Sequence, residues 1–302
     1  MFKNVIKKTL LVSVVCLLPS CDFKSSVKEI YTFKEAQVEF QKADEQTVVV
    51  FDVDGVLAYD PSAVQFFFYD PAKLTGDDAV FVKEARPILE KYIENKEIEK
   101  GHFFFTDLLN STLSKAKDIA PESIIVTMIH KLQSRGVKVI ALTSLPAGAF
   151  GTVASGRELR IEKLKNLGID FSSSLNQDEI VFDNLKKYNG DYPMFYKGVL
   201  FTNWNNDKGS VLGDFFSRVK WNPTKVLFFD DHDFHVKEVE KTMHELGISY
   251  RGYWYRACKK IPRPPFNLEI AQLQLKYLLE HDELLLPYEA AAMLQQATNE
   301  KK

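Results

Sequence analysis

The sequence FDVDG at residues 51–55 carries two aspartates, Asp52 and Asp54, two positions apart. They follow residues 48–51, a short apolar run that predicts a buried parallel strand. Carboxylates at the end of a strand can attack phosphorus, bind a divalent cation or exchange protons with a substrate. The Asp-Gly step is also typical of a turn, so this segment taken alone leaves both interpretations open.

Five further side chains of chemical interest follow a predicted strand or begin a predicted helix, namely Thr143, Ser144, Lys208, Asp230 and Asp231. In an open parallel sheet, ligands bind beyond the carboxyl ends of the strands. Acids, hydroxyls and a cation would therefore gather at one edge if these strands are neighbours. Each also has an ordinary interpretation: a strand-end turn for Thr143, a solvated lysine for Lys208 and a helix cap for the acid pair.

The elements that must position these side chains alternate between strand and helix from residue 137 onward. Strands are predicted at residues 48–51, 137–142, 179–182, 198–202, 225–229 and 249–255. Helices are predicted at residues 33–43, 77–95, 107–116, 121–134, 157–166, 207–219, 234–246, 267–280 and 288–298. We expect the second helix to be kinked or split at Pro87 and the fourth to hold Pro121 in its first turn. The alternation indicates βαβ units and a mainly parallel α/β sheet.

Taken together, these motifs resemble those of the haloacid dehalogenase (HAD)-like hydrolase superfamily. Residues 52–56 match its Asp-x-Asp-x-Thr/Val motif, and Thr143, Lys208 and Asp230-Asp231 match its other three motifs in the same order. The resemblance covers roughly residues 47–256. It implies a three-layer, doubly wound, Rossmann-like parallel sheet with a helical cap insertion. The chain looks most like a group of uncharacterised bacterial HAD-like proteins. It is more distantly similar to the exported class C acid phosphatases, whose fourth motif has a glycine that this chain lacks.

The resemblance implies phosphatase chemistry for the first motif. Asp52 would be the nucleophile that forms an aspartyl-phosphate, and it would also bind Mg²⁺. Asp54 would bind Mg²⁺ through its backbone carbonyl, while its side chain acts as general acid and base. An acid at this second position marks the phosphatases and phosphomutases of the superfamily, whereas the dehalogenases lack it.

The other motifs would supply the remaining ligands. Asp230 and Asp231 would complete the Mg²⁺ site, and the sequence does not decide which of them is the direct ligand. Thr143, Ser144 and Lys208 would hold the phosphoryl oxygens and offset their charge. Neighbouring histidines at 232 and 235 are interpreted as surface or supporting residues, because no third soft ligand points to zinc.

The predicted domain organisation places the insertion between the first two motifs. The expected units are a lipoprotein signal peptide at 1–20, a tether and helix at 21–46, a catalytic core at 47–59 and 137–262, a helical cap at 60–136, and C-terminal helices at 263–302. The resemblance implies that the cap reads the leaving group of a small phosphorylated substrate. Tyr59 and the aromatic residues at 66–69 are predicted to form a hinge or a pocket wall.

The N-terminus has the pattern of an export signal. Lysines precede an apolar stretch at residues 9–18, which is too short to span a bilayer. The following Leu18-Pro19-Ser20-Cys21 resembles the lipobox of bacterial lipoproteins, which implies a lipidated Cys21 and a membrane-anchored protein on the periplasmic side or the cell surface. A plain secretory signal or an uncleaved anchor is the alternative.

Composition limits the remaining classes of protein. The 302 residues are 45% hydrophobic and 26% charged, which is ordinary for a packed globular chain. The formal net charge of -2 offers no basic surface for nucleic acid. The resemblance implies phosphomonoester hydrolysis as the function. The alternative is an inactive HAD-like surface or effector lipoprotein, because fold alone does not establish function.

Overall fold

The structure is a computed structural model that describes residues 26–61 and 70–300. One sheet joins eight strands in the order β1-β8-β7-β2-β3-β6-β5-β4. These strands are β1 (Val27–Ile30), β2 (Thr47–Phe51), β3 (Lys138–Thr143), β4 (Glu179–Val181), β5 (Met194–Tyr196), β6 (Val199–Phe201), β7 (Lys225–Asp230) and β8 (Ser249–Tyr255). In this spatial order, each strand from β1 through β8, β7, β2 and β3 to β6 pairs in parallel with the next. Strands β5 and β4 then extend the sheet with antiparallel pairing. The predicted mainly parallel α/β sheet is confirmed.

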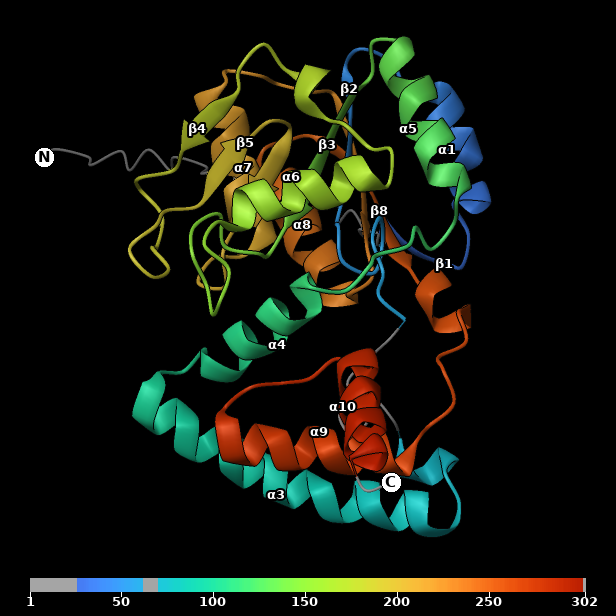
Figure 1. Cartoon of the computed structure of the whole chain (residues 1–302). Coiled ribbons are helices and arrows are strands. Elements are labelled where there is room, and N and C mark those ends of the chain that lie inside the picture. The colour runs from blue at the N-terminus through green and yellow to red at the C-terminus, as the bar shows by residue number, and fades with distance from the viewer. Residues whose placement is uncertain (1–25, 62–69, 301–302) are drawn as a thin grey trace, which may run out of the picture.

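Helices cover both faces of this sheet (Figure 1). They are α1 (Gln37–Lys42), α5 (Ile124–Ser134) and α6 (Gly156–Asn166) on one face, and α7 (Lys208–Arg218) and α8 (Asp233–Glu245) on the other. The central strand β2 explains this arrangement, because all five of its residues are buried. Val49 and Phe51 contribute to one apolar core, while Val48 and Val50 contribute to the other. A strand that is buried at every position requires cover on both sides, and three layers result.

Two segments differ from their prediction at the edges of the sheet. Residues 27–30, assigned to a polar tether, form the edge strand β1 and pair with β8. Strand β5 was not predicted, and it links β4 to β6. Strand β1 is short and pairs with a strand at the other end of the chain, and β5 has only three residues, so local patterning carries little signal for either of them.

The helix containing Pro87 is not split, because α3 runs continuously over Gly76–Lys100. Pro121 does not open a helix, since α5 begins only at Ile124. The intervening Glu122 instead accepts hydrogen bonds from the Phe33 backbone N–H and the Tyr255 hydroxyl, both at 2.8 Å. These partly buried hydrogen bonds tie the segment before α5 to two distant parts of the chain.

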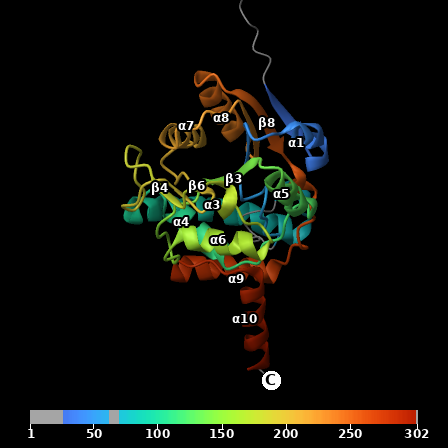
Figure 2. The same cartoon turned by 90° about the horizontal axis from the view of Figure 1, so that it is seen from above.

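Two helices of the insertion pack together with a helix of the C-terminal segment. Helices α3, α4 (Phe104–Ser114) and α9 (Leu268–His281) share one apolar cluster, and we call these three helices the composite cap. Figure 1 shows α3 and α9 side by side below the sheet, and Figure 2 shows α10 (Pro287–Asn299) extending away from the body. Asp282, just after α9, accepts hydrogen bonds from Tyr92 and Lys96 of α3, each at 2.8 Å. Helix α9 and the residue that follows it therefore pack on the insertion.

Within residues 26–61 and 70–300, no helix has the length and apolar character needed to cross a bilayer. The predicted signal segment, Cys21 and the aromatic residues 66–69 lie outside the described residues.

Candidate functional site

The predicted site residues meet where three parallel strands end. Asp52 directly follows β2, whereas Thr143 and Asp230 are the last residues of β3 and β7. β2 pairs in parallel with both neighbours, and Phe51 lies opposite Ala141 on one side and Phe229 on the other. Parallel pairing therefore brings the ends of all three strands to one edge.

Lys208 joins two of the buried carboxylates. Its Nζ lies 2.7 Å from Oδ1 of Asp52 and 2.7 Å from Oδ2 of Asp230. All three side chains are almost fully buried. The adjacent Gly209 allows α7 to pack closely against α8. A Cβ at this position would lie 2.6 Å from the backbone oxygen of Glu238 in α8.

Burial and mutual charge govern the protonation of this trio. Burial raises the pKa of Asp52, the Asp230 carboxylate raises it further, and Lys208 offsets only part of that rise. Burial alone would lower the pKa of Lys208, but the carboxylates of Asp230 and Asp52 outweigh burial and raise it. An excess of negative charge at a dry sheet edge is the setting in which a divalent cation binds.

The second acid of the fourth motif points toward the first motif. Gly55 has a φ of +82°, and a Cβ there would lie 2.5 Å from Oδ2 of Asp231. A glycine is thus required both for the backbone conformation and for the approach of this carboxylate. Asp231 also lies 2.8 Å, through Oδ1, from Nδ1 of His232.

Asp230, Asp231 and His232 form a group that could hold a metal, with ligand atoms all within 4.8 Å of one another. Both carboxylate oxygens of Asp230 already have partners. Oδ2 accepts a hydrogen bond from Lys208, and Oδ1 accepts one from the His232 backbone N–H at 2.9 Å. Asp231 is half-buried and has more freedom to turn. His232, interpreted from the sequence as a supporting residue, belongs to this group, and its position directly after the acids was the available signal.

The predicted phosphate-binding hydroxyls lie at the same edge. Thr143 is buried, and its Oγ1 accepts a hydrogen bond from the Leu145 backbone N–H at 3.2 Å. Ser144 follows it and is half-buried. The Thr143 contact is also that of a strand-end turn, so both interpretations of this residue retain support.

Asp54 has a partner that the sequence analysis missed. Arg160 of α6 donates from Nη1 to Oδ1 at 3.0 Å and from Nη2 to Oδ2 at 2.6 Å. The Arg160 side chain is only 5% exposed, whereas that of Asp54 is 64% exposed. The sequence holds a signal for a buried arginine here. Arg160 is spaced at i, i+4 from Gly156 and Leu164, which places it on the buried face of its helix.

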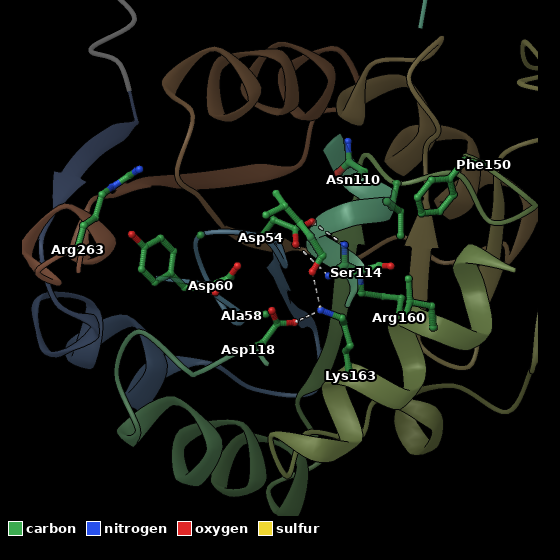
Figure 3. Close-up of a pocket in the computed structure, with 15 residues that line it drawn as sticks. Asp54, Ala58, Asp60, Asn110, Ser114, Asp118, Phe150, Arg160, Lys163 and Arg263 are labelled. Carbon is green, nitrogen blue, oxygen red and sulfur yellow. Dashed lines mark hydrogen bonds and ion pairs between the residues drawn. The ribbon is translucent and has the colours of Figure 1, made fainter. Parts of the chain in front are cut away.

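A pocket of about 250 Å³ opens beside Asp54, between the sheet edge and α4 (Figure 3). It is lined by Asp54, Gly55, Ala58, Tyr59, Asp60, Asn110, Leu113, Ser114, Asp118, Leu145, Phe150, Leu159, Arg160, Lys163 and Arg263. The prediction that Tyr59 forms part of a pocket wall is confirmed. Asp52, Lys208 and the acids of the fourth motif do not line this pocket, so it adjoins the cluster at the strand ends and does not contain it.

Lys163 and Asp118 form a second ion pair in this pocket. Lys163 Nζ lies 3.0 Å from Asp118 Oδ2, and it also donates to the backbone oxygens of Leu113 and Ala116. Burial raises the pKa of Asp118, and Lys163 counteracts part of that rise. With three acceptors, the Lys163 ammonium has used its three donor hydrogens.

Comparison with known proteins places this site in a family. An uncharacterized protein of Rickettsia prowazekii (strain Madrid E) is 22% identical over 286 residues, 94% of this chain and 97% of the relative. One from Rickettsia bellii (strain RML369-C) is 23% identical over 255 residues, 80% and 81% of the two chains. A Chlamydia pneumoniae protein named "Putative outer membrane protein" is 27% identical over 174 residues, 57% and 58% of the two chains. The family described as "Protein of unknown function (DUF2608)" matches residues 29–291, and the chain belongs to that family.

Proposed function

We propose that this protein is a Mg²⁺-dependent phosphomonoester hydrolase of the HAD type, with Asp52 as its nucleophile. The observation that carries the proposal is the buried trio at the strand ends, in which Lys208 bridges Asp52 and Asp230 at 2.7 Å each. A lysine in this place can hold a phosphoryl oxygen while the carboxylate beside it attacks.

The proposed reaction has two steps. In the first, an oxygen of Asp52 forms a bond to phosphorus, the ester P–O bond breaks, and the leaving oxygen takes a proton from Asp54. In the second, water attacks the aspartyl-phosphate and gives its proton to Asp54. Inorganic phosphate then leaves, and the Asp52 carboxylate is restored. Thr143, Ser144 and Lys208 would hold the phosphoryl oxygens in both steps.

The donor set fits Mg²⁺. Asp52, Asp230 and Asp231 offer carboxylate oxygens at one edge, and among the described residues Lys208 is the lysine that shares ion pairs with two of them. Mg²⁺ takes oxygen ligands and commonly only one or two carboxylates. We assign Asp52, the Asp54 backbone carbonyl and one or both of Asp230 and Asp231 to hold it. When bound, it would neutralise the phosphate charge that otherwise repels the attacking carboxylate.

The lipobox-like segment ending at Cys21 supports an exported, lipid-anchored protein. The name of the chlamydial relative agrees with a location at the cell envelope. The proposed partners are thus a small phosphorylated substrate and, through Cys21, a membrane, with no nucleic acid.

Hydrolysis of p-nitrophenyl phosphate by the full-length protein, with Mg²⁺ and with a chelator, tests the proposal. We expect Mg²⁺-dependent release of phosphate that is lost in Asp52→Asn and retained in Asp233→Asn, which changes an exposed acid paired with Lys237. Equal rates for wild type and Asp52→Asn would exclude Asp52 as the nucleophile.

The alternative is a HAD-like protein that binds a ligand or partner without turnover. The pairing of Asp54 with Arg160 favours it, because both oxygens of the proposed acid and base are engaged. If the alternative holds, a substrate screen would yield no Mg²⁺-dependent hydrolysis, whereas phosphate or its analogues would still bind.

A further inference from the structure

Arg160 has more hydrogen-bonding capacity than its contact with Asp54 uses. Two of its nitrogens donate to the Asp54 carboxylate, whereas its Nε is buried and has no hydrogen-bond partner among the described residues. Figure 3 shows Arg160 and Asp54 facing each other at the wall of the pocket. A buried donor without an acceptor is costly, so Arg160 retains a hydrogen-bonding capacity that Asp54 does not satisfy.

The location of Arg160 assigns it to one side of the substrate. The groups proposed to hold the phosphoryl oxygens, Thr143 and Lys208, do not line the pocket, whereas Arg160 does. A phosphomonoester bound at Asp52 would therefore place its alcohol portion, not its phosphoryl group, toward Arg160. With about 250 Å³ available, the pocket lies near the small end of ligand sites, which range from about 300 to 1,000 Å³.

The charge of the pocket depends on the position of Asp54. Its charged lining consists of three cations and three carboxylates, namely Arg160, Lys163, Arg263, Asp54, Asp60 and Asp118. To protonate the leaving oxygen, Asp54 must turn toward the phosphorus attacked by Asp52. Two carboxylates then face three cations, and Arg160 is left buried without its counter-charge. Leaving a buried cation unpaired is strongly unfavourable, so a substrate that supplies a replacement anion is favoured.

The shape of the site indicates which anion. The guanidinium fork already holds a carboxylate in bidentate geometry, that of Asp54. All three donor hydrogens of Lys163 already have acceptors. Arg263 lies on the far side of the pocket from Arg160 (Figure 3). One carboxylate exchanged for another conserves both the charge and the planar shape at Arg160.

We infer, on the basis of the proposed phosphatase function, that the substrates are phosphomonoesters of small hydroxy acids, whose carboxylate replaces that of Asp54 on Arg160. Arg160 is then the residue that determines specificity. Its release of Asp54 on substrate binding couples recognition of the leaving group to the freeing of the acid and base. Hydrolysis would yield inorganic phosphate and the free hydroxy acid.

A matched pair of substrates tests this inference in the full-length protein. D-3-phosphoglycerate has a carboxylate at the position where sn-glycerol 3-phosphate has a hydroxymethyl group. We expect kcat/KM to be at least about tenfold higher for the carboxylate, the factor that a charge-assisted hydrogen bond contributes. Arg160→Gln should bring the ratio of the two kcat/KM values close to one. The control is Arg157→Gln, which removes another cation of α6, one that pairs with Glu179 of β4, and it should preserve the ratio. A merely structural role of Arg160 would lower both substrates equally.

A second measurement does not depend on the folding of a variant. In the wild type, D-glycerate should inhibit hydrolysis of p-nitrophenyl phosphate with a Ki at least about tenfold below that of glycerol. Equal kcat/KM for the two esters, or equal inhibition by the two products, would overturn the inference and leave the phosphatase proposal standing. If no phosphate ester is hydrolysed with Mg²⁺, the proposed function fails and the inference fails with it.

Discussion

Nζ of Lys208 lies 2.7 Å from Oδ1 of Asp52, and both side chains are buried. The lysine begins α7 and the aspartate follows β2, so the contact depends on the packing of a helix against a distant strand. The same ammonium reaches Asp230 at the end of β7. One cation thus stabilises two carboxylates that would otherwise repel each other in a dry environment.

Removing this cation should destabilise the fold as well as abolish activity. Lys208→Met leaves Asp52 and Asp230 buried without compensation, and breaking a buried pair in this way costs about 3–5 kcal/mol. Urea denaturation should show this loss in the free energy of unfolding. Adding Asp230→Asn to the variant should recover part of it. The exposed pair of Lys237 with Asp233 supplies the control, since Lys237→Met should change stability little. A small effect of Lys208→Met would show that the trio is not dry.

Gly55→Ala should weaken Mg²⁺ binding in addition to straining the backbone. The left-handed conformation costs a non-glycine residue about 1–2 kcal/mol, and the new Cβ would meet the Asp231 carboxylate at 2.5 Å. Gly76→Ala is a matched control, because Gly76 also has a positive φ but nothing within 4 Å of its added Cβ. Calorimetric titration with Mg²⁺ should show reduced affinity for Gly55→Ala only. Equal affinities would mean that Asp231 takes no part in the metal site.

Mg²⁺ should stabilise the folded protein through the same carboxylates. A ligand that binds only the native state adds about 2.7 kcal/mol at 100 times its Kd. Thermal unfolding should therefore shift to higher temperature with Mg²⁺ in wild type and in Asp233→Asn, but not in Asp231→Asn. Chelation should reverse the shift. If Asp231→Asn retains the full stabilisation, Asp230 carries the metal without it.

The composite cap should weaken in acid through Asp282. Hydrogen bonds from Lys100 and Lys96 hold the pKa of this carboxyl well below its usual range. A depressed pKa adds stability that is complete above the ordinary aspartate value of about 3.9 and is lost as the pH falls through the folded-state value. The destabilisation caused by Asp282→Asn should thus be constant near neutrality and shrink below about pH 4.

Urea unfolding of wild type and Asp282→Asn at several pH values would measure this difference. The neighbouring Glu283 is exposed, and Glu283→Gln should show no such dependence on pH. A destabilisation by Asp282→Asn that persists unchanged in acid would indicate that packing, not charge, is responsible.

Several local features were predictable because adjacent residues decide them. Strand β8 was predicted with its observed bounds, Ser249–Tyr255. A helix was predicted from residue 207, and Asp207 caps α7, since its side chain accepts from the Ser210 backbone N–H at 2.7 Å. The buried strand before Asp52 followed from an unbroken apolar run. In each case, the signal lies within one helical turn or one strand.

Long-range partners were not predictable in this way. Strand β1 has the half-polar sequence VKEI, which was interpreted as part of a tether. Its pairing with β8, far away in the chain, makes it a strand. The C-terminal helices were predicted without a packing partner, and the structure joins Asp282, just after α9, to Tyr92 of α3. The spacing of Arg160 in its helix indicates a buried position, but nothing near it in the chain indicates Asp54 as its partner.

Local sequence patterns were enough to predict the central strands, most of the helices that follow them, and the acids, hydroxyls and lysine of the site, because apolar periodicity and motif spacing are local properties. The tertiary structure alone decided that Lys208 bridges two carboxylates, that Arg160 holds Asp54, and that both chain segments beyond the core build one cap. Those contacts join residues far apart in the chain, so they form only when packing brings the strand ends and the helices together.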